Sequence, residues 1–325
     1  MGNCVTCKSK KSGAEIAPFE FVKPAVSVRL RGSPSSSATA YLRFALRFKS
    51  PSFQFVPAEE EDGGGVPELR IGSERASGTG EMMLRFIDAR LPLPPLLPAP
   101  GRAAAERVMV VRAVVLQHRS VAWHLDRVVR WGEDLAARGG RGTVDPEMGT
   151  PRMEVRKFAK SYSTLLELMV EHAQMEERVV FPVLDLADRG ICKAANEDHA
   201  RNLPMMNGIK EDIKSIGVLD TGCLDYQEAL SNLSTRLKSL QEQCKEQFEK
   251  EERDVMPLME AVELSKEQQM GLMHQCFVVM QGTHSHLFSF FIEGLLPSEA
   301  MQYLDLILKC KDEHGAVSML HRLIE

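Results

Sequence analysis

The sequence predicts a protein of two parts, a small α/β unit followed by a long all-helical region that folds as a bundle. Three observations predict this division. Residues 20–90 alternate strand-like and helix-like stretches, which are separated by turns rich in glycine and proline. Residues 91–101 read LPLPPLLPAPG, and prolines at this density exclude a continuous helix. From residue 102 onward, apolar residues recur at helical spacing and the sequence has no strand pattern.

Length and composition narrow the class of protein. The chain has 325 residues, 44% of them hydrophobic and 26% charged, and its net charge is −5. This length accommodates two domains that each bury a core. The negative charge gives no electrostatic support for nucleic acid as a partner. Seven scattered cysteines favour reduced thiols and a cytoplasmic protein over a disulfide framework.

The first 19 residues are expected to be disordered and to carry lipid. The chain opens MGNCVTCKSKK, in which Gly2 followed by Thr6 fits the myristoylation pattern and Cys4 is a candidate for palmitoylation. A single myristoyl chain binds membranes only marginally, so the second lipid or the nearby lysines are needed for stable attachment. We therefore expect a tether to the plasma membrane or an endomembrane. A redox or metal pair at Cys4 and Cys7, or a plain disordered start, are the alternatives.

The α/β unit at 20–90 is expected from five stretches. AVSVRLR alternates polar and apolar residues as a strand does, and Tyr41, Phe44 and Phe48 share one face of the helix that follows. Turn signals separate the remaining stretches. The expected elements are a strand at 25–31, a helix at 38–48, strands at 52–56 and 66–72, and a helix at 78–89.

This order, with Val66-Pro67 entering the third strand, resembles the thioredoxin-like domain at the front of glutathione transferases. The resemblance implies a cis proline at Pro67 that shapes a glutathione site, and a serine, Ser35, that activates the glutathione thiol. Redox members of the fold carry C-x-x-C where this chain has Ser35, Ser36 and Ser37, so disulfide exchange is not expected. Retention of the fold for packing or docking is the alternative.

The linker at 91–101 marks the boundary to a helical bundle at 102–264 and a helical extension at 265–325. Gly139-Gly140 is a helix stop, Pro151 suits a first helical turn, and Ser265 with Gln268 forms a capping box. The extension, rich in Met and Phe, is expected to form two helices that cover the bundle or pack on the α/β unit; a partner-binding groove is the alternative. The expected bundle helices are 104–137, 151–190, 193–216 and 226–264.

A repeated phrase places metal-binding side chains inside this bundle. EHAQMEERVVFPVL at 171–184 has a partial copy, EQFEKEERDVMPLM, at 246–259. In the first copy His172 precedes Glu176 by four residues, a spacing that puts both side chains on one helix face within reach of one metal ion. In the second copy Glu251 matches Glu176, and Gln247 occupies the place of His172. Helices that offer inward carboxylates beside histidines can hold a pair of metal ions.

Four helices together offer a mixed set of imidazoles and carboxylates, a set that suits iron, manganese or zinc and lacks the thiolates of structural zinc sites. The candidate residues, in chain order, are His118; His172 and Glu176; His199; and Glu251 with Gln247. The order of these residues, together with the EERVVFP and EERDVMP phrases, resembles the hemerythrin-like (HHE cation-binding) domain over residues 108–259.

The resemblance implies an up-down four-helix bundle around a non-haem di-iron centre. His118 and His172 would ligate one iron, and His199 would ligate the other. Glu176 and Glu251 would bridge the two ions. The family normally has histidine where this chain has Gln247, and an amide oxygen is a poorer iron ligand than imidazole. One or two iron ions are therefore expected, the second bound weakly, absent, or completed by water.

The remaining histidines and acids are interpreted without a metal role. His124 lies six residues from His118 and faces elsewhere, and His284 and His286 diverge because residues two apart on a helix do not share a face. Glu177 is expected to be a solvated charge. The chain is thus expected to bind iron and to sense or buffer iron or dioxygen, and the sequence leaves open whether it is also an enzyme. The alternatives are a glutathione transferase-like enzyme, or an interaction scaffold whose metal site has decayed at Gln247.

Overall fold

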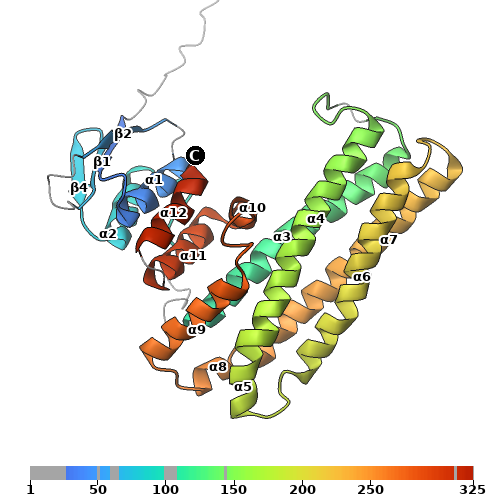
Figure 1. The fold of residues 1–325 in the computed structure, drawn as a ribbon. Helices are drawn as coiled ribbons and strands as arrows, with labels where there is room; N and C mark the ends of the chain where they lie inside the picture. Colours follow the sequence, from blue (N-terminus) through green and yellow to red (C-terminus); the bar gives the residue numbers. More distant parts are fainter. Residues whose placement is uncertain are drawn as a thin grey trace, which may run out of the picture.

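The computed structural model describes residues 27–49, 52–58, 66–98, 108–142, 145–310 and 313–324. Figure 1 shows the α/β unit at one end of the molecule and the long helices of the bundle at the other. The helices of the C-terminal extension lie between these two parts and contact both of them. The predicted division into a small α/β region and a helical region is therefore confirmed.

The α/β unit contains a four-stranded sheet in the order β2-β1-β3-β4. Strand β1 pairs parallel with β2 and antiparallel with β3, and β4 pairs antiparallel with β3. The face of α1 that was expected to be buried, with Tyr41, Phe44 and Ala45, packs into the core. The elements are β1 (Val28–Gly32), α1 (Ser37–Lys49), β2 (Gln54–Pro57), β3 (Glu68–Ile71), β4 (Glu74–Ser77) and α2 (Gly80–Arg90).

Two features of this unit differ from the sequence-based expectations. Strand β4 was not assigned from the sequence because its four residues, ERAS, are short and largely exposed. It follows a tight turn in which Gly72 has a φ of +62°, a conformation that favours glycine. The implied cis peptide at Pro67 is also wrong. Among the described residues the cis peptide joins Leu93 and Pro94, so the Val66–Pro67 bond is trans.

The first part of the proline-rich linker packs back onto the α/β unit instead of extending away from it. Leu96 is buried, and the Asp88 carboxylate accepts hydrogen bonds from the backbone N–H groups of Leu96 and Leu97, at 3.0 Å each. Asp88 also pairs with the Lys49 ammonium at 2.6 Å. Capping of these N–H groups by a charged side chain compensates for the hydrogen bonds that a proline-rich segment cannot form with itself. The end of the linker, from residue 99, lies outside the described residues.

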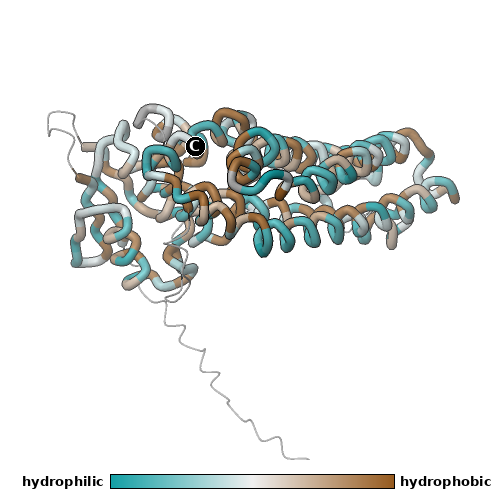
Figure 2. Tube along the Cα trace, turned by 90° about the horizontal axis from the view of Figure 1, so that it is seen from below, coloured by the Kyte–Doolittle hydropathy of each residue, from teal (hydrophilic) through white to brown (hydrophobic). Residues whose placement is uncertain are grey.

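Four long helices form the bundle. Each helix packs against two others, so that α3 contacts α4 and α7, and α6 completes the ring between α4 and α7. As predicted, Gly139 ends α3 in the left-handed conformation and Pro151 lies in the first turn of α4. Thr150 caps α4 by accepting a hydrogen bond from Met153 N. Figure 2 shows hydrophilic and hydrophobic residues alternating along these helices. Their bounds are α3 (Met109–Arg138), α4 (Pro151–Met175), α6 (Lys193–Val218) and α7 (Leu224–Lys250).

Both copies of the repeated phrase change from α- to π-helix at their glutamates. The π turns are η2 (Glu176–Val180) and η3 (Glu251–Val255), and short helices α5 (Phe181–Ala187) and α8 (Leu258–Ala261) follow them. In each turn the carbonyl of the first glutamate accepts from the N–H group five residues later. Pro182 and Pro257 come next and have no N–H to donate, so the regular α-helical ladder cannot continue through them. The turns therefore occur at the same place in both helices.

The C-terminal extension forms four helices where two were expected. The capping box predicted at Ser265 and Gln268 is present at the start of α9. Helices α9, α10 and α11 pack against α3, while α11 and α12 pack against α1. A turn at 280–287 and Gly294 divide the apolar stretch that the sequence suggested was continuous. The helices are α9 (Lys266–Val279), α10 (Phe288–Glu293), α11 (Pro297–Cys310) and α12 (Glu313–Ile324).

Within the described ranges, no helix combines the length and the apolar character needed to cross a lipid bilayer.

Gly294 sets how closely α10 approaches α3, and its substitution tests this contact. A Cβ atom at Gly294 would stand 2.8 Å from the Ser120 carbonyl oxygen and 2.9 Å from Ser120 Cα, which are backbone atoms that cannot turn aside. We expect Gly294→Ala to lower the free energy of unfolding by about 1–3 kcal/mol. Gly271→Ala is the matched control, because no atom lies within 4 Å of its added methyl group. Chemical denaturation should show the control unchanged or stabilised by about 0.5–1 kcal/mol; equal destabilisation of both variants would contradict the close-contact argument.

His124 makes the same α3–α10 contact sensitive to pH. Its Nε2 atom donates to the Phe290 carbonyl oxygen at 2.7 Å, and burial, with the charge of Arg127 nearby, lowers the pKa of His124 from 6.5 to about 4. Between pH 6.5 and 4 the unfolded chain therefore binds a proton that the folded chain does not, so stability falls as the pH falls. The shifted pKa of His124 therefore lowers the free energy of unfolding by about 3 kcal/mol at a pH below both pKa values. His124→Gln keeps a donor without a titrating group and should flatten the curve of unfolding free energy against pH; parallel curves would refute the assignment.

Candidate metal centre

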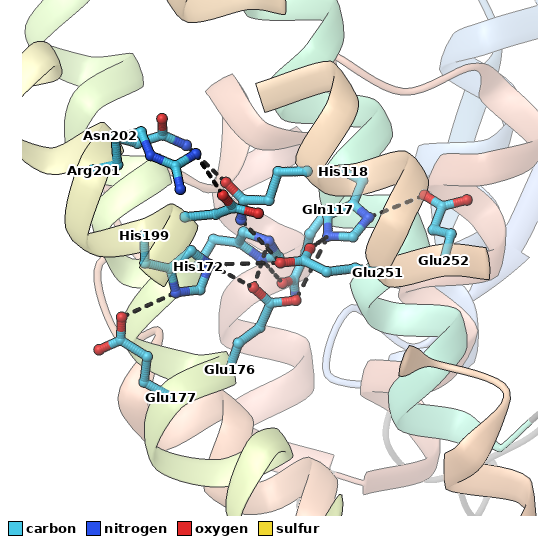
Figure 3. Close-up of polar contacts among 12 residues, drawn as sticks. Gln117, His118, His172, Glu176, Glu177, His199, Arg201, Asn202, Glu251 and Glu252 are labelled. Atoms are coloured by element: carbon cyan, nitrogen blue, oxygen red, sulfur yellow. Dashed lines mark hydrogen bonds and ion pairs between the residues drawn. The ribbon is translucent and has the colours of Figure 1, made fainter. Parts of the chain in front are cut away.

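The five side chains predicted as metal ligands converge at one point inside the bundle (Figure 3). They come from all four long helices or the π turns that continue them, and all five are buried. The repeated four-residue spacing brings His172 and Glu176 together on one helix, as the sequence predicted. The positions are His118 on α3, His172 on α4, Glu176 at the start of η2, His199 on α6 and Glu251 at the start of η3.

The ligand atoms fall into two groups that share one carboxylate. Atoms of His118, His172 and Glu176 lie within 4.8 Å of one another, and so do atoms of Glu176, His199 and Glu251. Glu176 Oε2 lies 3.3 Å from His172 Nε2 and 3.4 Å from His199 Nε2. Two atoms that bind one ion at about 2.1 Å stand about 3.0–3.4 Å apart. The spacing therefore suits two neighbouring ion positions with Glu176 between them.

The unpaired atoms of this cluster fit a metal ion. Six buried atoms have no hydrogen-bond partner among the described residues: Nε2 of His118, His172 and His199, both carboxylate oxygens of Glu176, and Glu251 Oε2. Buried polar atoms without partners cost free energy, and proteins seldom gather several of them in one place. A cation bound at this point would satisfy these atoms together, so the donor set fits a metal.

Each imidazole is held from its outer side by a hydrogen bond at Nδ1. The acceptors are Gln117 Oε1 for His172 at 2.8 Å, Glu252 Oε1 for His118 at 3.0 Å, and Glu177 Oε1 for His199 at 2.9 Å. Glu177 and Glu252 lie on opposite sides of the cluster in Figure 3. An acceptor at Nδ1 fixes the proton there and leaves the Nε2 lone pair free for a metal.

The sequence-based interpretation of Glu177 as a merely solvated charge is therefore incomplete. In both copies of the Glu-Glu doublet, the first glutamate points into the cluster and the second orients a histidine on another helix. The doublet itself was the available signal. On a single helix the second glutamate of the doublet points about 100° away from the first. This geometry does not show which residue of another helix the second glutamate contacts.

The charges of the cluster compensate one another. Burial alone would lower the pKa of His118 and His199, but Glu176 and Glu251 raise the pKa of His118 well above its ordinary value and that of His199 to about 9. Burial chiefly lowers the pKa of His172 to about 4. Burial alone would raise the pKa of Glu176, yet the three histidines hold it well below its usual range. Positive charge on the ligand set, from protons or from a cation, therefore stabilises the buried carboxylates.

Comparison with protein families identifies this part of the chain. Residues 109–259 match the family model of the hemerythrin HHE cation-binding domain. These residues form a hemerythrin HHE domain. The domain runs from the start of α3 to the first residues of α8, and so contains all five predicted ligands. No curated protein and no solved structure gives a significant match to the chain.

Gln247 stands in the hemerythrin domain where the resemblance leads us to expect a histidine. Its Nε2 group donates to Glu251 Oε1 at 3.0 Å, and its oxygen accepts from Asn202 Nδ2 at 2.8 Å. The amide therefore turns its donor toward the carboxylate and its oxygen toward Asn202. In this orientation its NH₂ group supports Glu251 and its oxygen is engaged by Asn202.

A cavity reaches the hemerythrin site from the surface between α4, α6 and α7. Its volume is about 210 Å³, and His172, His199 and Gln247 line its inner end. Apolar side chains such as Val121, Met206 and Phe248 form much of its wall, while the exposed residues Glu177 and Arg178 stand at its rim. A water molecule takes about 30 Å³ in the liquid, so the cavity has room for a small ligand beside the metal position.

The other predicted sites lie outside the hemerythrin domain. Ser35 is exposed in the turn before α1, with its hydroxyl 2.8 Å from that of Ser33. Pro67 lies beside the end of β1, where a Cβ atom on Gly32 would stand 3.3 Å from its ring. Glutathione binding at Ser35 and Pro67 stays a prediction. The lipidation sites Gly2 and Cys4 lie outside the described residues.

Gln247→Leu and Gln247→His test the second ion position. The pair Gln247–Glu251 repeats the spacing of His172–Glu176, so a histidine at 247 should create a second imidazole-carboxylate pair of this spacing, with Glu251. We expect Gln247→His to bind the second ion at least about 10-fold more tightly, because imidazole is the better ligand. Gln247→Leu, which fills the same space without a donor atom, is the control. Anaerobic Fe²⁺ titration measures the stoichiometry, and identical curves for all three proteins would contradict this role for position 247.

Proposed function

We propose that this protein binds non-haem iron in its hemerythrin domain, as one tightly held ion or as two ions. The single observation that carries the proposal is the convergence of six partnerless nitrogen and oxygen atoms from four helices at one buried point. His118, His172 and Glu176 would hold the first ion. Glu176 and Glu251 would bridge to the second, which His199 would complete.

The donor set favours iron over the metals of structural sites. Three imidazoles and two carboxylates form a mixed nitrogen and oxygen environment, which suits iron and excludes the thiolate sites typical of structural zinc. Cys244 lines the neighbouring cavity, but burial raises the pKa of its thiol to about 12. A neutral, buried thiol is a poor metal ligand, so the cysteine does not compete with the histidines.

The arrangement suits a sensor or a buffer of iron or dioxygen. Iron bound at this site would supply an open coordination position for dioxygen, and the cavity beside His199 and Gln247 gives a small ligand a route to it. The buried carboxylates also link folding to the metal, because loss of the cation leaves their charge compensated only by protonated histidines. The stability of the bundle would in this way depend on the concentration of available iron.

The N-terminus and the α/β unit suggest the location of the protein and its contacts. We propose that acylation of Gly2 and Cys4 tethers a cytoplasmic protein to a membrane surface, on the strength of the MGNC start and the lysines that follow it. For the α/β unit we favour a docking role over glutathione chemistry, because α11 and α12 pack against α1 and His321 Nε2 contacts the Pro34 carbonyl oxygen at 3.0 Å. Glutathione binding at the exposed Ser35 is the second candidate function.

Metal-linked stability tests the iron proposal. Saturating Fe²⁺ under anaerobic conditions should raise the melting temperature by about 5–10 °C, since binding at 100 times Kd stabilises the folded state by about 2.7 kcal/mol. His172→Ala and Glu176→Ala should each abolish the rise because each removes a proposed ligand. His274→Ala, at an exposed histidine on α9, is the matched control and should keep it. Equal melting of the wild-type protein with and without Fe²⁺ would count against the proposal.

A further inference from the structure

A chain of buried hydrogen bonds leads from the metal centre into the C-terminal extension. His172 Nδ1 lies 2.8 Å from Gln117 Oε1, and Gln117 Nε2 donates to the Tyr303 hydroxyl at 3.3 Å. The Tyr303 hydroxyl lies 2.8 Å from His284 Nε2, and His284 Nδ1 lies 2.7 Å from the Met280 carbonyl oxygen. His172 and Gln117 belong to the hemerythrin domain, whereas Tyr303 and His284 lie beyond its last residue, 259.

The far end of this chain fixes the direction of every bond in it. The Met280 carbonyl can only accept, so Nδ1 of His284 carries a proton, and with one proton on the ring Nε2 is an acceptor. The Tyr303 hydroxyl must then donate to His284, which leaves its oxygen to accept from the Gln117 amide group. Gln117 in turn presents its oxygen to His172, so the proton of His172 sits on Nδ1 and Nε2 faces the metal position.

The turn that carries His284 is attached to the same helix as His172. The carboxylate of Glu171, one residue before His172, accepts from the backbone N–H groups of Gly282 at 2.8 Å and Thr283 at 2.6 Å, and from the Thr283 hydroxyl at 2.7 Å. One helical turn earlier, Glu167 Oε1 lies 2.8 Å from His286 Nε2. These contacts hold the turn in register with α4, so the hydrogen-bond chain joins two elements whose relative position is already set.

The two histidines of this turn were expected to have no role because they diverge, and they do diverge. His286 points to the surface acid Glu167, whereas His284 points inward and stacks on the Tyr303 ring at a centroid distance of 5.9 Å. Tyr303 also packs on Phe291 with a centroid distance of 4.5 Å. Both Tyr303 and Gln117 are almost fully buried.

We propose that Tyr303 and His284 are positioning residues of the metal centre, which impose the Nδ1–H form of His172 through Gln117. The C-terminal extension thereby completes a site whose ligands all lie in the hemerythrin domain. The part of the proposal that concerns metal affinity rests on the iron-binding function proposed above, while the part that concerns the proton position of His172 does not. By reciprocity, a metal on His172 also strengthens the attachment of the extension.

Removal of one hydroxyl group tests the relay. In Tyr303→Phe the Gln117 amide group loses its acceptor, and an amide flip that turns its NH₂ group toward His172 moves the His172 proton to Nε2, the atom that must bind the metal. In metal-free full-length protein labelled with ¹⁵N-histidine, the imidazole shifts should report Nδ1–H for His172 in the wild type and a mixture with Nε2–H in the variant. Tyr162→Phe is the matched control, since Tyr162 is also buried and donates to a backbone carbonyl, that of Met206, at 2.9 Å.

Metal affinity provides the second measurement on the same three proteins. Anaerobic Fe²⁺ titration against a competing chelator should show a 10- to 100-fold weaker affinity for Tyr303→Phe and an unchanged affinity for Tyr162→Phe. Equal affinities for the two variants, or a His172 proton that stays on Nδ1 in Tyr303→Phe, would overturn the proposal. A wild-type protein that binds no Fe²⁺ would refute the iron function, and the ¹⁵N measurement would still decide whether the relay sets the proton position.

Discussion

The bundle is organised around two buried carboxylates. Glu176 and Glu251 are almost fully buried, and ionised carboxylates in such a place must be compensated by opposite charge. Three histidines surround them, and two of these have raised pKa values because of them. Either protons or a cation can supply the positive charge, and a cation would bind all six atoms that lack hydrogen-bond partners at once. This requirement explains why polar residues occupy the centre of an otherwise apolar bundle.

The two copies of the repeated phrase contribute to this one centre in similar ways. Each copy carries a proline near its end, each changes to a π turn at the first glutamate of its Glu-Glu doublet, and each uses the second glutamate of the doublet to orient a histidine of another helix. The copies differ at one position of the site. The first copy has His172, and the second has Gln247 at the matching position, where its amide donates to Glu251. The cavity beside the centre is lined by residues of both copies, among them His172 and Gln247.

The sequence correctly predicted features whose geometry depends only on residues nearby in the chain. The four-residue spacing of His172 and Glu176, the cap at Gly139 and the capping box at Ser265 depend on neighbours within two helical turns, and all three are present. Contacts between distant segments could not be predicted in this way. The roles of Glu177 and Tyr303 depend on which helix faces them, and the trans peptide at Pro67 departs from what a family resemblance implied. The short exposed strand β4 carried too little apolar pattern to be recognised.

The central claim is that side chains of four helices hold iron at one buried point. Metal analysis of the full-length protein, purified without added iron and compared with Glu176→Ala purified in parallel, tests this claim most directly. The account predicts between one and two iron atoms per chain in the wild type and little or none in the variant. A wild-type protein free of iron that also fails to take up Fe²⁺ anaerobically, or a variant that keeps the same iron content, would contradict it.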